Sequence, residues 1–460
     1  MADDIKNKKA AKKEQEKKTK EQDKKTPEKK GFIKSLQKRK IKVEKNGKTK
    51  AEITKTEADK ENKDNIKKIK IEKPKADISK NDNKKKVKEY YDYSFIFAIL
   101  FLLVFGLIMI FSASSYTAEL KFKSSAFFVK KQLGYVVFGC MLMMVVSRIP
   151  YTLWIKLSKF IYAVTTFLAL LVLIIGKDVN GAKRWLKIGP INFQPSETVK
   201  VAIIIFLAYY LVKYKDELHS DDRKVVEKKL WILFAIVSVP TLLVMKENLS
   251  TAIIIFLIAF CMSFMGTVNK RLHLAGALAM GIALFTAKPL VKFIYDRGIR
   301  DYHLTRFLVW AEPEKFSRDG GYQVMQGLYA IGSGKILGKG LGLGMQKFFL
   351  PESQNDMIFA IIVEEMGLFG AGLVMAIFAF MIYRMLIITF SVKEPEGVYL
   401  VVGVLIDLSL QVILNIAVVT GVLPNTGVSL PFISFGGSSI LILLAEMGIV
   451  LSVARTIKME

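Results

Sequence analysis

Cysteine is almost absent from this chain of 460 residues, which contains two, Cys140 and Cys261. Both lie within apolar runs and neither belongs to a CxxC pair, so the sequence offers no disulfide framework and no cysteine-based metal site. We interpret both thiols as small buried hydrophobic side chains. A cleavable signal peptide is not expected either, because the first residues are polar and the first apolar run begins far from the N-terminus.

Aromatic residues are nearly missing from residues 1–93, whereas lysine is abundant there. This segment holds nearly half of the 68 lysines and arginines of a chain whose net charge is +27. Such a composition cannot bury enough apolar surface to fold, so we expect a disordered, lysine-rich cytoplasmic tail. Its lysines either bind anionic lipid headgroups or fix the membrane topology. The charge is too diffuse to indicate nucleic-acid binding.

The remainder, residues 94–460, is rich in apolar runs of about 20 residues, the length that crosses a hydrocarbon core. Together with a hydrophobic fraction of 52%, these runs predict an all-α polytopic membrane protein with ten transmembrane helices. The predicted spans are 94–112, 127–147, 152–176, 195–213, 230–246, 250–266, 272–292, 359–390, 398–420 and 435–454.

Lysine and arginine are expected to concentrate in cytoplasmic loops. The basic tail places the N-terminus in the cytoplasm, and an even number of spans returns the C-terminus to the same side. The loop after the fourth span and the loop at Lys270 and Arg271 are also basic, in agreement with this orientation. The extracytoplasmic face then carries residues 177–194, residues 421–434 and a long loop, 293–358, between helices 7 and 8.

The loop at 177–194 departs from the charge rule, because it places Lys177, Lys183, Arg184 and Lys187 outside. Positive charge on this side indicates an anionic ligand. The alternative is that the loop is anchored to lipid phosphates.

The long loop contains two features of its own. Residues 321–334 are apolar but too short to span, so we expect an interfacial or re-entrant segment with Gln323 and Gln326 on one helical face. The glycines at 332–344 do not match a phosphate-binding loop, because Lys335 is followed by isoleucine rather than serine or threonine. We expect these glycines to permit tight turns and close approach to a neighbour.

The segment from Gly340 to Gly370 is the most unusual part of the chain. It runs from a glycine-rich loop into an apolar helix and carries Asp356, Glu364 and Glu365. An ionised group at the centre of a bilayer costs about 2.5–3.5 kcal/mol on insertion scales. Three carboxylates at the mouth of an apolar helix therefore indicate a function rather than a folding role.

A polar stripe marks one of the last helices. Asp407, Gln411 and Asn415 repeat at four-residue spacing and so share one helical face. Such residues face a bundle interior or a cavity, either along a substrate path or in ordinary hydrogen bonds between helices. Glu446 in the last span is open to the same two interpretations.

Several of these stretches together resemble the SEDS proteins, the RodA/FtsW/SpoVE family of bacterial cell-wall polymerases. The resemblance covers residue 94 to the end, and the Gln346-Lys347 pair favours the division and sporulation branch, FtsW/SpoVE. The matching pieces are GLIMIFSASS (106–115), FVKKQ (128–132), NGAKRWLKIGPINFQPSE (180–197), GYQVMQGLYAIGSG (321–334), GLGLGMQKFFLPESQNDMIFAIIVEEMG (340–367), QVILNIAVVTGVLPNTGVSLPFISFGGSS (411–439) and the final span.

The resemblance implies that Asp356 is the catalytic residue, because it falls on the aspartate proposed for that role in the family. Gln354 stands where many members have histidine, which argues against an essential proton carrier there. Residues 246–252, KENLSTA, depart from the family pattern, so no role is assigned to them. The substrate-binding candidates are Lys183, Arg184, Glu197, Gln323, Lys347, Glu364, Glu365 and Ser434.

The implied activity is that of a peptidoglycan glycosyltransferase, which polymerises lipid II at the outer face of the bacterial cytoplasmic membrane. Asp356 would serve as general base, and Lys183, Arg184 and Lys347 would stabilise the pyrophosphate of the donor. A divalent cation, Mg²⁺ or Mn²⁺, would suit the same task, although no ligand cluster in the sequence identifies one.

The implied partners are a class B penicillin-binding transpeptidase and other divisome or elongasome proteins. Two other functions remain open at this point. Ten helices with intramembrane carboxylates and a polar stripe would suit a flippase of the same lipid-linked precursor, and the same helices could serve a non-catalytic division scaffold.

Overall fold

The computed structural model describes residues 91–179, 182–188, 191–297 and 302–457, and the statements below concern these residues. The tail predicted at residues 1–93 lies outside them except for its last three residues. Contacts within the chain separate Met1–Lys84 from Lys85–Glu460, and the described residues all belong to the second unit.

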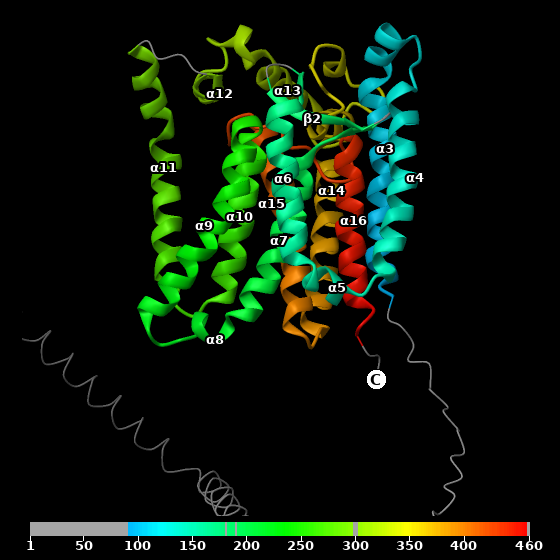
Figure 1. Cartoon of the computed structure of the whole chain (residues 1–460). Coiled ribbons are helices and arrows are strands. Elements are labelled where there is room, and N and C mark those ends of the chain that lie inside the picture. The colour runs from blue at the N-terminus through cyan, green and yellow to red at the C-terminus, as the bar shows by residue number, and fades with distance from the viewer. Residues whose placement is uncertain (1–90, 180–181, 189–190, 298–301, 458–460) are drawn as a thin grey trace, which may run out of the picture. The chain divides into compact units, whose positions relative to one another are not determined.

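Ten of the described helices are long and apolar enough to cross a membrane. They confirm the predicted all-α polytopic fold, and each overlaps a predicted span (Figure 1). The ten are α3 (Tyr93–Phe122), α4 (Phe127–Arg148), α6 (Ser158–Ile175), α7 (Pro195–Lys213), α9 (Arg223–Glu247), α10 (Leu249–Gly266), α11 (Arg271–Asp296), α14 (Ile358–Ser391), α15 (Pro395–Val419) and α16 (Gly437–Ala454).

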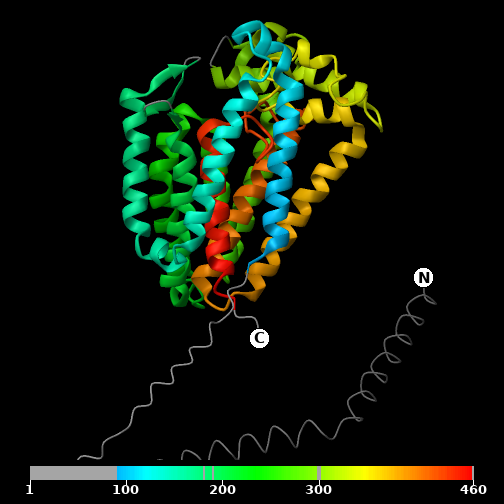
Figure 2. The same ribbon diagram turned by 90° about the vertical axis from the view of Figure 1, so that its right-hand side faces the viewer.

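Shorter elements gather at the two ends of this bundle. One end, where α3 begins and α16 ends, also carries α5 (Tyr151–Lys156) and α8 (Lys215–Leu218), and we call it the terminal end (Figure 1). The opposite end, the loop end, carries α12 (Tyr302–Ala311), α13 (Gly321–Gly334) and the 3₁₀ turns η1 (Ser317–Asp319) and η2 (Gln346–Phe348). Figure 2 shows the same separation from the side.

The loop at 177–194 is more ordered than the sequence suggested. It forms a three-stranded antiparallel sheet in the order β1 (Lys177–Val179), β2 (Ala182–Ile188) and β3 (Ile191–Phe193). Strand β2 pairs with both neighbours, with Trp185 opposite Lys177 and Leu186 opposite Phe193. The sheet satisfies the backbone of a connection that would otherwise need water for its hydrogen bonds.

Local sequence explains where several helices begin, and two of the predicted bounds were wrong. Asp92 caps α3, because its carboxylate accepts the backbone N–H of Phe95 at 2.9 Å, and a proline, Pro195, opens α7. Helix α3 continues past its predicted end at residue 112 to Phe122. The predicted span 152–176 is divided at Leu157 into α5 and α6.

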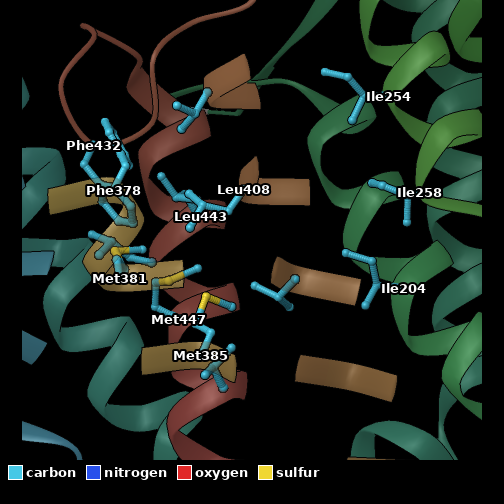
Figure 3. Packing of buried hydrophobic residues seen from close by; sticks show 14 of the residues in the cluster. Ile204, Ile254, Ile258, Phe378, Met381, Met385, Leu408, Phe432, Leu443 and Met447 are labelled. Carbon is cyan, nitrogen blue, oxygen red and sulfur yellow. The ribbon is translucent and has the colours of Figure 1, made fainter. Parts of the chain in front are cut away.

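Helix α16 lies at the centre of the bundle and packs against α4, α7, α14 and α15. Figure 3 shows Leu443 and Met447 of α16 in one buried cluster with Phe378, Met381 and Met385 of α14. Helix α11 lies at the periphery of the bundle, since only 6% of the residues in its most apolar 18-residue stretch are buried. Its exposed apolar surface suits contact with lipid.

Glycines fasten the start of the long apolar helix α14 to the turn that follows α13. A Cβ atom on Gly334 would lie 2.0 Å from the carbonyl oxygen of Val363. Gly338 has a φ of +78°, and a Cβ there would lie 2.2 Å from the carbonyl oxygen of Glu365. Only glycine allows such an approach, which agrees with the close contact predicted for this segment.

Candidate active site

A cavity of about 510 Å³ lies among the loop-end segments and reaches down between the helices. Four of the residues predicted for the site line it: Arg184, Glu197, Gln323 and Asp356. They come from β2, α7, α13 and the turn before α14, so the fold brings together residues spread over more than a third of the chain. Most of the other lining residues are polar, including Lys200, Asn248, Arg306, Gln411, Asn425 and Ser439.

Asp356 is held in place by two neighbouring helices. Asn415 of α15 donates from Nδ2 to the backbone carbonyl oxygen of Asp356 at 2.8 Å. Gln323 of α13 donates from Nε2 to the carboxylate oxygen Oδ1 at 3.5 Å. The amide of Gln323 is oriented in turn by Asn425, whose Nδ2 donates to Gln323 Oε1 at 2.9 Å. These bonds leave the carboxylate of Asp356 at the cavity wall.

The surroundings of Asp356 suit a base that works near neutral pH. Burial raises the pKa of Asp356 to about 6, against opposing hydrogen bonds from its own backbone N–H and that of Met357. The nearby carboxylate of Glu352 adds to the rise in pKa, and the Arg306 guanidinium reduces it. At pH 7 the group is therefore mostly ionised, and a pKa close to the working pH is the useful one for a general base.

Arg184 forms part of the opposite wall. Strand β2 presents it, and its Nε donates to the backbone carbonyl oxygen of Glu247 at 2.6 Å. This bond ties the sheet to the end of α9. The backbone of the neighbouring Lys183 lies in β2, whereas its side chain lies outside the described part of the structure.

The segment 246–252, which was assigned no role from its sequence, also reaches the cavity. Asn248, Ser250 and Thr251 line it, and Asn248 caps α10 by accepting the backbone N–H of Thr251 at 3.2 Å. Its departure from the family pattern therefore did not remove it from the site. The polar residues at a break between two apolar runs were the signal for it.

Lys200 is the most informative residue that the sequence analysis missed. It is buried at the base of the cavity, where its Nζ lies 3.1 Å from Glu197 Oε2 and 3.2 Å from Asp407 Oδ2. A lysine three residues after Glu197, inside an apolar span, is costly enough to have been a signal. Its pairing with Asp407 also explains part of the polar stripe on α15, of which Gln411 lines the cavity.

Glu364 does not line the cavity. It is buried, and its carboxylate accepts hydrogen bonds from Lys339 Nζ at 2.7 Å and from the backbone N–H groups of Met345 and Gln346 at 2.9 and 3.1 Å. These contacts hold the glycine-rich loop against the first turns of α14.

Glu365 and Lys347 form a second buried contact in the same loop. Glu365 accepts from Ser112 Oγ at 2.6 Å, from Lys347 Nζ at 3.1 Å and from the backbone N–H of Gly342 at 2.9 Å. The substrate-binding role predicted for Glu364, Glu365 and Lys347 stays a prediction, and their described contacts are those of residues that position the loop carrying Asp356.

Ser434 lies beside the cavity and faces a smaller void. Its hydroxyl accepts the backbone N–H of Leu430 at 2.8 Å. Gln132 of α4 clamps the same turn, donating to the Ser434 carbonyl oxygen at 3.3 Å and accepting the Gly436 N–H at 3.3 Å. Ser434 therefore stabilises a turn next to the cavity and does not line the cavity itself.

The described part of the chain contains no group of three or more His, Cys, Asp and Glu side chains that is arranged to hold a metal ion. The Mg²⁺ or Mn²⁺ considered from the sequence stays a prediction.

Comparison with solved structures supports the fold. A chain from the structure described as "Structural coordination of polymerization and crosslinking by a peptidoglycan synthase complex" has a TM-score of 0.64 at 22% identity, and covers 80% of this chain and 99% of its own. The rod shape determining protein RodA of Thermus thermophilus has a TM-score of 0.58 at 20% identity, with coverages of 80% and 98%.

Comparison of sequences identifies the family. The probable peptidoglycan glycosyltransferase FtsW of Geobacter sulfurreducens is 36% identical over 377 residues, which are 81% of this chain and 97% of that protein. Stage V sporulation protein E of Bacillus subtilis is 35% identical over 367 residues, which are 79% of this chain and 97% of that protein. The FtsW/RodA/SpoVE family model, described as "Cell cycle protein", matches residues 93–459. The chain therefore belongs to the FtsW/RodA/SpoVE family, as its motifs predicted.

Proposed function

We propose that this protein is a peptidoglycan glycosyltransferase that joins lipid II units into glycan strands for cell division or sporulation. The name of the FtsW relative, probable peptidoglycan glycosyltransferase, supports the enzyme class. The observation that carries the proposal is the single cavity that brings Arg184 to the same enclosure as Asp356, whose pKa is about 6.

The proposed chemistry assigns one task to each of these residues. The carboxylate of Asp356 takes the proton of the acceptor sugar hydroxyl as its oxygen bonds to the anomeric carbon of the donor. The bond between that carbon and the pyrophosphate oxygen breaks, and undecaprenyl pyrophosphate leaves. The guanidinium of Arg184 stabilises the negative charge that develops on the leaving group, because a planar cation can grip phosphate oxygens in a bidentate way.

The proposed orientation places the loop end outside the cytoplasmic membrane and both termini inside. Its support is the charge at the terminal end, where Lys213, Lys215, Arg223 and Lys224 surround α8, as expected for a cytoplasmic loop. A class B penicillin-binding transpeptidase is the proposed partner. The structural relative whose description names coordinated polymerization and crosslinking supports that pairing.

The test of this function is to supply the purified protein with labelled lipid II in detergent, with its transpeptidase present. A polymerase yields glycan strands where there is no membrane to cross. A flippase or a division scaffold yields none, so absence of strands from a folded complex would return the choice to those two alternatives.

The pH dependence of the reaction should follow the ionisation of the Asp356 carboxyl group. Because the general base must be ionised, kcat/KM should fall about tenfold for each pH unit below the pKa of about 6 and level off above about pH 7. The measurement is initial rate against pH with the purified complex. A flat profile between pH 5 and 8 would exclude a base with this pKa.

Replacement of Arg184 should weaken use of the pyrophosphate-bearing donor more than replacement of Lys183. Arg184→Ala removes a guanidinium from the cavity wall, whereas Lys183→Ala removes at most a point charge. We expect roughly a tenfold or larger fall in kcat/KM for Arg184→Ala, corresponding to about 1.4 kcal/mol or more, with Arg184→Lys as the matched control that keeps the charge. Equal and negligible effects of both alanine changes would make the sheet a lipid anchor.

A further inference from the structure

A group of charged side chains is buried directly below the cavity, between α7, α15 and α16. It contains one cation, Lys200, and three carboxyl groups, those of Glu197, Asp407 and Glu446. Lys200 pairs with Glu197 at 3.1 Å and with Asp407 at 3.2 Å. Glu446 is 1% exposed and Asp407 is 0% exposed. Glu197 is the most exposed of the three acids, with 15% of its side-chain surface accessible, and it lines the cavity. If Asp407 and Glu446 were both ionised, Lys200 would have to balance two negative charges in the interior of the bundle in addition to that of Glu197.

Glu446 and Asp407 are in direct contact. Their carboxyl groups lie within hydrogen-bonding reach of each other. An ionised carboxylate has no hydrogen to donate, so a hydrogen bond between two carboxyl groups requires a proton on one of them. Two carboxylates that share a site do not both ionise, because like charges at this separation repel strongly.

One side of the pair is apolar. Figure 3 shows Leu408, the neighbour of Asp407, in one buried cluster with Leu443 and Met447, which lie one turn before Glu446 and next to it on α16. The charge near the pair that could balance a second carboxylate is that of Lys200, which already pairs with both Glu197 and Asp407.

A small void adjoins the pair and contains an atom that lacks a partner. The void measures about 20 Å³ and is lined by Glu197, Lys200, Gln411, Ser434, Ser439 and Glu446, among others. The Oε1 atom of Glu446 is buried and has no hydrogen-bond partner among the described residues. A buried water needs about 10–15 Å³ and two to four polar partners, so the void fits one water.

The other helices around α16 leave this charge balance unchanged. The charged groups acting on Glu446 are Asp407 from α15 and Lys200 and Glu197 from α7. Helices α4, α5 and α14 and strand β3 also pack against α16. On α4 the nearest contact is apolar, with Val146 against Gly448, while its titratable Tyr135 lies against Gly437 and its Cys140 is a neutral thiol at neutral pH. On α14, Glu364 and Glu365 are engaged with the glycine-rich loop, Arg384 pairs with Asp92 at 2.8 Å, and Tyr383 is exposed. The basic residues of α4 and α5 are exposed, Tyr151 of α5 is neutral at neutral pH, and β3 contains no ionisable side chain.

We propose that Glu446 and Asp407 form a buried proton-binding site beneath the cavity, in which the two carboxyl groups share one proton and a water molecule in the adjoining void hydrogen-bonds to Glu446. The proton comes from solvent water during folding. Glu197 lines both the void and the cavity, so this site is joined to the candidate active site by one side chain. The proposal does not depend on the glycosyltransferase reaction.

The test is infrared spectroscopy of the full-length protein in a detergent without ester groups, in H₂O and D₂O. At pH 8 the wild-type protein should show a band of a protonated carboxylic acid that shifts in D₂O. Glu446→Gln should lose this band, because an amide donates to Asp407 in place of the proton. Asp407→Asn should change its frequency, because the bonding partner of Glu446 changes.

Asp356→Asn is the matched control. With a pKa of about 6, Asp356 contributes a protonated-acid band only in acidic solution, so this variant should lose the acidic component and keep the band at pH 8. Gel filtration and circular dichroism confirm that each variant is folded. Absence of the band from wild-type protein at pH 8, or an unchanged band in both Glu446→Gln and Asp407→Asn, would overturn the proposal. Lipid II is not needed, so this result and the polymerisation assay can fail separately.

Discussion

Asp356→Asn should reduce lipid II polymerisation by about 10²–10⁴-fold, the usual effect of losing a general base. Asparagine has nearly the same shape and can still accept the hydrogen bond from Gln323, but its amide cannot take a proton. The backbone bond from Asn415 is unaffected. The variant should therefore insert, express and associate with its transpeptidase as the wild-type protein does. The measurement is glycan synthesis from labelled lipid II, with folding checked by gel filtration.

Glu352→Gln provides the control for this prediction. Glu352 is a second carboxylate at the cavity wall, and it raises the pKa of Asp356. Its neutralisation should keep activity at pH 7 and move the acid limb of the pH profile to lower pH. A near wild-type rate for Asp356→Asn would remove this residue from the mechanism. That result would favour a transporter or a scaffold as the function of this protein.

Glu364→Ala should impair both folding stability and polymerisation, although Glu364 does not touch the cavity. The change leaves the backbone N–H groups of Met345 and Gln346 without their acceptor. Each buried donor left unsatisfied costs about 1–3 kcal/mol. The loop that precedes Asp356 should loosen, so we expect a fall of several degrees in Tm and at least a tenfold fall in kcat. The measurements are thermal unfolding in detergent and steady-state kinetics.

Lys339→Met separates the contribution of the Lys339–Glu364 ion pair from that of the two backbone hydrogen bonds to Glu364. Lys339 is about a third exposed, and its removal leaves both backbone bonds to Glu364 in place, so its effect on Tm should be much smaller. If Glu364 instead bound substrate directly, as its place in the family motif suggested, Glu364→Ala would raise KM and leave Tm unchanged.

The fold was largely predictable because membrane insertion imposes a simple length and hydropathy rule on each span. The glycines of the long loop also correctly predicted a close backbone contact. The sheet at 177–194 was not predicted, because two of its strands have three residues each and its basic residues were interpreted as a contact with an anionic ligand or with lipid phosphates. The predicted third span ran through Leu157, although Lys156, Ser158 and Lys159 surround this residue. These polar residues were the signal for the break between α5 and α6.

The candidate site was predictable only in part. The motifs identified Asp356, Arg184, Glu197 and Gln323, which the structure gathers around one cavity. A sequence motif identifies all the characteristic residues of a loop at once. It does not distinguish a side chain that faces the cavity from one that holds the loop in place. Glu364 and Glu365 show this limit. Lys200 escaped notice because its partner Asp407 lies 207 positions away in the chain, and only folding reveals such a pair.

The glycine contacts at the start of α14 have a consequence for which substitutions this protein tolerates. Leu368 and Phe369 donate their backbone N–H groups to the carbonyl oxygens of Lys335 and Ile336, both at 3.0 Å. Residues 335–369 are therefore closed at their two ends by main-chain bonds, and this closure requires glycine at the points of closest approach, Gly334, Gly338 and Gly367. Helix α3 meets this closed segment through Ser112 and Ala113. A side chain introduced at one of these glycines should therefore displace the segment that carries Asp356, whereas a change between apolar residues on the exposed face of α11 should leave that segment in place.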